Sequence, residues 1–181
     1  MVIIFGPPGA GKSVQGQLVA ARHGWRWLST GQLLRDAHNP RLHEVMVKGE
    51  LVSNQQINNV MAAALKQAGG IDDVILDGYP RNTSQAEWLL GKLPEYNHQV
   101  TALVYLETSD KELYRRLQLR GRADDTPENI AKRSKEYKEK TQPVIDFLKK
   151  SGVCSVKVNG EGSVGAVFDR VEKAVQSCIQ S

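Results

Sequence analysis

The sequence has few cysteines and no long hydrophobic segment. Its two cysteines, Cys154 and Cys178, lie far apart and outside any metal-ligand spacing, so we expect neither a disulfide framework nor a zinc site. No apolar run in the sequence approaches the length of a membrane span. No internal repeat or low-complexity tract interrupts the 181 residues. These absences predict one soluble domain in a reducing compartment, the cytoplasm, with no membrane partner.

The charge balance is mildly basic. Lysine and arginine number 24 against 20 aspartate and glutamate residues, which gives a formal net charge of +4. Such an excess can serve nucleic-acid binding, but the arginines are dispersed along the chain and lie mostly within motifs. Small anionic substrates explain this pattern better. We therefore expect no nucleic-acid partner, and we expect a monomer.

The first thirteen residues carry the clearest motif. An apolar run at Val2–Phe5 predicts a buried strand, and Gly6–Ser13 (GPPGAGKS) follows it directly and matches the phosphate-binding loop pattern. Its glycines let backbone N–H groups approach an anion, and a helix beginning near Lys12 would add its N-terminal dipole. Lys12 would reach the terminal phosphates, and the Ser13 hydroxyl would bind Mg²⁺. A simple glycine-rich turn would require neither residue.

The rest of the chain alternates between apolar runs and helical patterns. Strands are expected at residues 2–5, 25–28, 73–77, 100–107 and 154–158. Helices are expected at residues 12–23, 30–37, 41–48, 54–68, 110–119 and 163–179, and in a long segment that Thr126-Pro127 opens and Pro143 kinks or divides. Five strands alternating with helices predict an α/β fold with a doubly wound parallel sheet. The ligand is then expected at the carboxyl ends of the strands.

A phosphate loop indicates a nucleotide but not a reaction, so the other motifs must decide. They are Ser29–Arg35 (STGQLLR), Gly49–Val52 (GELV), Asp77–Arg81 (DGYPR) with Gln85, and Arg120–Asp125 (RGRADD) with Arg133. Together with the loop, these motifs resemble those of the adenylate kinases, within the nucleoside monophosphate kinase family. The resemblance implies the P-loop NTPase fold and a single kinase domain over residues 1–181. It also implies a helical AMP-binding insertion at about residues 29–53 and a minimal lid at about residues 120–126.

The resemblance also implies the reaction and the residues that perform it. The expected reaction transfers the γ-phosphoryl group of ATP in line to AMP, giving two ADP, with Mg²⁺ and without a covalent intermediate. The implied ATP-binding residues are Gly9, Ala10, Gly11, Lys12, Ser13, Val14, Arg120 and Gly162. The implied AMP-binding residues are Thr30, Arg35, Glu50, Leu51, Val52, Gly78, Tyr79, Pro80, Arg81, Gln85, Arg122 and Arg133. The implied catalytic residues are Lys12, Arg81, Arg120, Arg122 and Arg133, with Ser13 and Asp77 holding Mg²⁺ largely through water.

Physical reasoning supports several of these roles and leaves others open. Asp77 ends a strand beside the first strand, where its carboxylate can hold Mg²⁺ through water, although an aspartate before a glycine also suits a turn. Arg81 follows Pro80 on a rigid turn, so its guanidinium can clamp a phosphate with two hydrogen bonds. Arg120, Arg122 and Arg133 would neutralise charge during phosphoryl transfer, whereas arginines on a helix can also form a solvated face.

Three features bear on the acceptor and on departures from the family pattern. Because Thr30 and Gln85 match the adenylate kinase pattern, the resemblance implies AMP rather than UMP or CMP as the acceptor. Another nucleoside or deoxynucleoside monophosphate kinase, or a nucleotide-binding module with little turnover, remains an alternative. Ser53-Asn54 replaces the family's common proline–aspartate pair, a change expected to affect helix capping more than catalysis. Only Gly121 separates Arg120 from Arg122, so we expect very little lid.

Overall fold

A computed structural model describes residues 1–36, 52–68, 73–121 and 125–180. Its centre is a five-stranded parallel sheet with the strand order β2-β3-β1-β4-β5. The strands are β1 (Val2–Phe5), β2 (Arg26–Ser29), β3 (Val74–Asp77), β4 (Ala102–Glu107) and β5 (Cys154–Asn159). The model therefore confirms the predicted α/β class and parallel sheet, with strand bounds within two residues of those expected.

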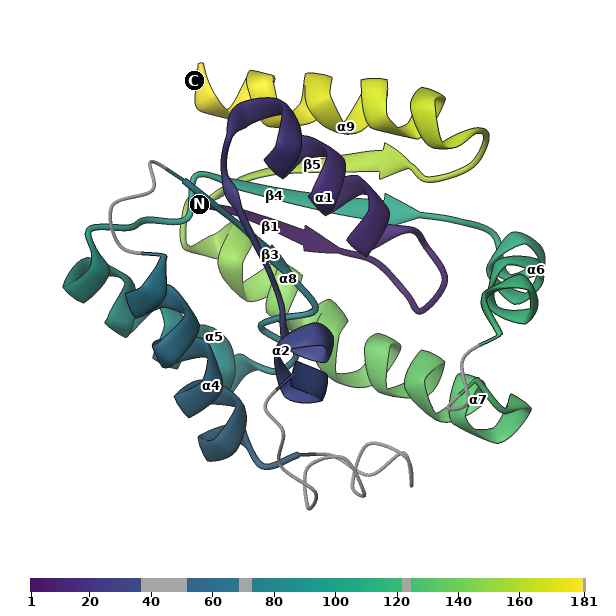
Figure 1. Ribbon diagram of the computed structural model, residues 1–181, viewed down its shortest axis with the longest axis horizontal. Coiled ribbons are helices and arrows are strands. Elements are labelled where there is room, and N and C mark those ends of the chain that lie inside the picture. The colour runs from purple at the N-terminus through teal and green to yellow at the C-terminus, as the bar shows by residue number, and fades with distance from the viewer. Residues whose placement is uncertain (37–51, 69–72, 122–124, 181) are drawn as a thin grey trace.

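Helices cover both faces of the sheet. They are α1 (Lys12–His23), α2 (Thr30–Asp36), α4 (Asn54–Gln67), α5 (Thr83–Lys92), α6 (Asp110–Arg120), α7 (Pro127–Glu136), α8 (Gln142–Lys150) and α9 (Val164–Ile179). A short 3₁₀ helix, η1 (Leu93–Tyr96), follows α5. Figure 1 shows α1 and α9 over one face, with α4, α5 and α8 over the other. The helix expected at residues 41–48 lies outside the described residues. In the described ranges, every helix is too short or too polar to cross a membrane.

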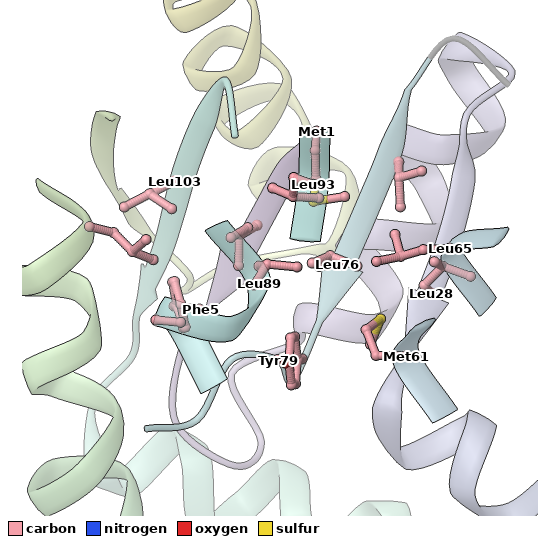
Figure 2. Packing of buried hydrophobic residues seen from close by; sticks show 14 of the residues in the cluster. Met1, Phe5, Leu28, Met61, Leu65, Leu76, Tyr79, Leu89, Leu93 and Leu103 are labelled. Carbon is pink, nitrogen blue, oxygen red and sulfur yellow. The ribbon is translucent and has the colours of Figure 1, made fainter. Parts of the chain in front are cut away.

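The alternation of side chains along the strands builds a separate core on each face. Along β1, Val2 and Ile4 pack into the cluster shared with α1 and α9, whereas Ile3 and Phe5 pack into the cluster shared with α4, α5 and α8. All four residues are buried, as a strand covered on both faces requires. Figure 2 shows the second cluster, in which Phe5, Leu76 and Leu103 from three strands meet Leu65 and Leu89. The two cores hold the carboxyl ends of the strands at one edge.

Polar caps set where several helices begin, as the sequence predicts. The Ser53 hydroxyl accepts a hydrogen bond from the backbone N–H of Gln56, and Oε1 of Gln56 accepts one from the backbone N–H of Ser53, which forms a capping box for α4. The Thr126 and Ser163 hydroxyls cap α7 and α9 by accepting hydrogen bonds from the backbone N–H groups of Asn129 and Ala166, without a reciprocal bond. At the other end of the first helix, Gly24 closes α1 in a left-handed conformation with φ of 71°. These local signals mark where the helices begin and end.

The long helix predicted after Thr126 is divided close to Pro143. A π-turn, η2 (Tyr137–Thr141), separates α7 from α8, and Pro143 lies in the first turn of α8. A proline lacks the N–H that would continue the helical ladder, so the division falls where an i to i+4 hydrogen bond would be lost. The buried residues Val144, Ile145 and Leu148 then face the sheet.

The expectation for the cysteines is wrong. Cys154, which opens β5, and Cys178, near the end of α9, form a disulfide with a Cα–Cα distance of 5.6 Å. The 24-residue separation hid this contact, because the chain runs along β5 and returns along α9, which packs against that strand. The pair therefore lies together in space although it is distant in sequence, and the inference of a reducing compartment loses its support from cysteine usage.

Candidate active site

The phosphate loop connects β1 to α1 at the carboxyl edge of the sheet. Gly9 and Gly11 have φ of 87° and 96°, a region that favours glycine, and a Cβ on Gly9 would lie 3.0 Å from the Leu113 carbonyl oxygen. The loop is thus built for a close backbone approach. Helix α1 begins at Lys12, as predicted, so its first N–H groups are directed toward the loop.

Lys12 lies inside this loop. Its ammonium donates hydrogen bonds to the carbonyl oxygens of Gly6 and Pro7, at 2.8 and 3.0 Å. Burial lowers the pKa of Lys12 to about 8 from its usual 10.5, and the neighbouring Asp77 carboxylate opposes the shift. The positive charges of the nearby arginines, beginning with Arg81, add to the lowering. An anion bound in the loop would relieve this concentration of positive charge.

Ser13 and Asp77 form the centre expected for the metal. The Ser13 hydroxyl donates a hydrogen bond of 2.6 Å to the Asp77 carboxylate, which is only 3% exposed at the end of β3. A hydroxyl and a carboxylate supply oxygen ligands, which Mg²⁺ prefers, and Mg²⁺ completes its shell with water and phosphate oxygens. In the described ranges, no group of three or more His, Cys, Asp or Glu side chains is arranged so that it could hold a metal ion. The pair therefore fits Mg²⁺ shared with a nucleotide better than a metal held by protein alone.

A cavity of about 300 Å³ joins the phosphate loop to the predicted acceptor residues. Its wall includes most of the predicted site, namely Lys12, Ser13, Thr30, Arg35, Val52, Asp77, Gly78, Pro80, Arg81, Gln85, Arg120 and Arg133. Gly9, Ala10, Gly11, Val14 and Gly162 lie outside this wall. Glu50, Leu51 and Arg122 lie outside the described residues. The two predicted anion sites thus face one cavity rather than opposite ends of the sheet.

Arg81 lies on the acceptor side of this cavity. Its Nε donates to the carbonyl oxygen of Gly78 at 2.9 Å, and the Thr30 hydroxyl donates to the same oxygen at 2.9 Å. Desolvation by the cavity walls lowers the pKa of Arg81, and the Arg133 charge adds to this, while Asp77 and Glu136 oppose it. Arg35, at the end of α2, donates to Gln32 at 3.0 Å. Two guanidinium groups thus line the acceptor side.

Tyr79 has a different position from its neighbours. Its ring is 1% exposed and belongs to the core cluster, where Figure 2 shows it beneath the sheet. The hydroxyl donates to Asn58 at 2.7 Å, and burial raises the pKa of Tyr79 above its usual value. The ring also meets Trp88 edge to face. The Tyr79 side chain therefore packs in the core next to the turn, so a contact of Tyr79 with AMP would have to come from its backbone.

Arg120 and Arg133 converge on one carboxylate. Asp125 accepts from Arg120 at 2.5 and 2.7 Å and from Arg133 at 2.6 Å, and the Asp125 side chain is 3% exposed. Burial alone would raise the pKa of Asp125, but the two guanidinium groups hold it below its usual value. Asp125 is part of the sequence motif Arg120–Asp125, but no role was predicted for it. The structure shows that it holds two predicted catalytic arginines at the cavity.

The comparisons with known proteins bear on the same residues. A family model described as adenylate kinase matches residues 4–153. A protein of Synechococcus sp. (strain CC9311) named "Adenylate kinase" is 40% identical over 177 residues, covering 94% of this chain and 96% of its own length. Proteins with the same name from Prochlorococcus marinus (strain NATL2A) and Xanthomonas oryzae pv. oryzae (strain MAFF 311018) are each 36% identical and cover 96% of this chain, with 97% and 98% of their own lengths.

The chain belongs to the adenylate kinase family. It is therefore a phosphotransferase acting between ATP and AMP, and nothing in the comparisons favours a UMP, CMP or deoxynucleotide kinase or a module without turnover. Both the family model and the relatives extend over most of the chain.

Sequence reasoning missed an arginine that contacts the phosphate loop. Arg116 donates to the carbonyl oxygens of Ala10 and Gly160, at 3.3 and 2.9 Å, and thereby joins the phosphate loop to the loop after β5. Glu112 fixes it through a hydrogen bond of 2.7 Å one helical turn earlier. The only sequence signal was this glutamate–arginine pair at i and i+4, which is common on exposed helices.

A larger hollow of about 970 Å³ lies on the other side of the phosphate loop. Its wall includes Pro7, Thr108 and Lys157 but none of the predicted site residues. The smaller cavity is the candidate active site, because it contains the predicted phosphate-binding lysine, the candidate metal ligands and the predicted acceptor arginines.

Proposed function

We propose that the 300 Å³ cavity is the place where the γ-phosphoryl group of ATP moves to AMP. The observation that supports this most strongly is that Lys12 of the donor loop and Arg81 of the acceptor turn line the same cavity. In-line transfer requires the donor and acceptor phosphates to meet end to end, and a shared cavity with cations at both ends permits this. A covalent intermediate is not needed.

On the donor side, the loop N–H groups, Lys12 and Ser13 would bind the ATP phosphates. Lys12 is mostly protonated near neutral pH, because its lowered pKa of about 8 still lies above it. When bound there, Mg²⁺ would supply positive charge to neutralise the charge that develops on the phosphates. Ser13 and Asp77 are the residues that would hold the ion.

On the acceptor side, Arg35 and Arg81 would hold the AMP phosphate, and Gln85 would contact its base. Arg120 and Arg133 would stabilise the transferring group, since each can keep its contact with Asp125 and direct further N–H donors at a phosphate. Arg122 would join this set, and Glu50 and Leu51 would contact the acceptor, as the family resemblance implies. The helical insertion and minimal lid remain part of this proposal.

We also propose a monomer in the cytoplasm. The reaction needs ATP and AMP together, and these nucleotides occur together in the cytoplasm. The disulfide calls for a direct check, because thiols there are usually reduced. Alkylating the free thiols in cells before lysis, followed by mass spectrometry, would show which form the protein takes.

The proposed reaction is tested by ADP formation from ATP and Mg²⁺ with AMP, UMP, CMP, GMP and dAMP in turn. We expect AMP to give the highest kcat/KM. A preference for another acceptor would assign a different base specificity, and nucleotide binding without ADP formation would indicate a binding module. The reaction without AMP reports ATP hydrolysis permitted by the short lid.

A further inference from the structure

Asn54, the first residue of α4, contacts Gln85 across the cavity wall. The Oδ1 atom of Asn54 accepts two hydrogen bonds, from Nε2 of Gln85 and from Nδ2 of Asn82, each at 2.9 Å. Helix capping does not account for this side chain, because Ser53 provides the cap of α4. Both Asn54 and Gln85 line the cavity. The asparagine therefore acts on the site rather than on the helix end alone.

Two backbone donors fix the orientation of these amides. The N–H of Arg81 donates to Oε1 of Gln85 at 2.7 Å, and the N–H of Gln85 donates to Oδ1 of Asn82 at 3.0 Å. A backbone N–H can only face an acceptor, so each amide must direct its oxygen at the backbone and its NH₂ group the other way. Both NH₂ groups then point at Asn54. An acceptor at this position satisfies both of them, and a residue without one leaves them unpaired.

This arrangement determines what Gln85 presents to a ligand. Gln85 is 2% exposed, and its described side-chain contacts use one Nε2 hydrogen and one lone pair of Oε1. One donor and one acceptor, side by side, are left for a ligand in the cavity. A 6-aminopurine carries an acceptor next to a donor on its edge and complements that pair, whereas a 6-oxopurine carries the reverse order.

We infer that Asn54 is a positioning residue that selects a 6-aminopurine acceptor by holding the amide of Gln85 in one orientation. The inference rests on the proposed acceptor site and adds a residue to it. Because the required property is an acceptor oxygen, Asp should replace Asn54 in this role, whereas Ala should not.

The test compares kcat and KM for AMP and inosine monophosphate in the wild type, Asn54→Ala, Asn54→Asp and the neighbouring control Gln55→Ala. For Asn54→Ala we expect KM for AMP to rise about tenfold with kcat within about twofold, the size of one lost hydrogen bond. The preference for AMP over inosine monophosphate should fall by a similar factor. For Asn54→Asp, KM for AMP and the base preference should stay within about threefold of the wild-type values, and for Gln55→Ala both should equal the wild-type values. Thermal unfolding checks that each variant is folded.

Other results overturn the inference. If Asn54→Ala keeps the wild-type KM and base preference, or if Asn54→Asp loses them equally, Asn54 does not position Gln85. A wild type that makes no ADP from AMP would instead contradict the proposed function. In that case AMP and inosine monophosphate binding, measured by calorimetry in the same four proteins, decides the role of Asn54 separately.

Discussion

The hydroxyl of Ser13 donates a hydrogen bond of 2.6 Å to the carboxylate of Asp77, although 64 residues separate them in the sequence. The parallel pairing of β1 with β3 brings them together, because Ile4 lies opposite Asp77 at the carboxyl edge. Ser13 follows Lys12 directly in the sequence, so its hydroxyl lies next to the lysine of the loop.

We expect Ser13→Ala to raise the Mg²⁺ concentration needed for half-maximal activity at least tenfold, because one oxygen ligand is lost. Ser13→Thr keeps the hydroxyl and is the matched control. Titrating Mg²⁺ at fixed ATP and AMP measures the effect. An unchanged Mg²⁺ requirement in Ser13→Ala would remove Ser13 from the metal site.

Removing the guanidinium of Arg81 should affect catalysis more than folding. We expect Arg81→Ala to lower kcat/KM for AMP by about 100-fold or more, because the acceptor phosphate would lose a charge contact. Arg115→Ala is the control, because Arg115 is exposed and pairs with Glu112 outside the cavity. A loss of less than about tenfold in steady-state kinetics would count against the role of Arg81.

The lowered pKa of Lys12 predicts a pH dependence of stability. Below pH about 8 Lys12 is charged in both states, and the folded state bears the cost of burying the charge. Between about 8 and 10.5 the unfolded chain binds more protons at Lys12, so this residue favours folding increasingly as the pH rises. Lys12→Met should therefore unfold at higher urea than the wild type at pH 7. Its advantage in free energy of unfolding should shrink by on the order of 1 kcal/mol at pH 9.5. An advantage that stays constant or grows would contradict the assigned pKa.

The Cys154–Cys178 disulfide should stabilise the fold. It closes a segment with a sequence separation of 24 residues, for which the chain-entropy model gives about 3 kcal/mol. We expect reductant to lower the Tm of the wild type by roughly 5 to 10 °C. The double variant Cys154→Ser/Cys178→Ser should melt near the reduced wild type and ignore reductant. If reductant shifts both proteins equally, the disulfide is not the cause.

Local signals in the sequence predicted much of this molecule. The apolar run before Gly6, the capping residues Ser53, Thr126 and Ser163, and the break near Pro143 each determine structure through neighbours in the chain. The order of the motifs along the chain also indicated the family. The helix α5 and the short η1 were not given bounds, because their apolar residues show no pattern strong enough to separate them from the flanking turns.

The features that escaped prediction depend on which elements meet in space. The roles of Asn54, Arg116 and Asp125 appear only when α4, α6 and the segment before α7 are placed against the cavity or the phosphate loop.

The disulfide, by contrast, could have been predicted from the lengths of the expected elements. A six-residue strand extends about 20 Å and a 16-residue helix about 24 Å, so a chain that turns back after β5 returns its last helical residues to the beginning of the strand.

The π-turn at Tyr137–Thr141 joins two helices, α7 and α8, that have different surroundings. Ahead of it, Arg133 faces the nucleotide cavity, and behind it, Ile145 and Leu148 face the hydrophobic core. One additional residue in a helix rotates everything that follows by about 100°. The π-turn therefore sets the rotation between the charged face of α7 and the apolar face of α8. Deleting one residue from this turn would rotate α8 relative to α7 by about 100°, so either Arg133 would turn away from the cavity or Ile145 and Leu148 would turn away from the core.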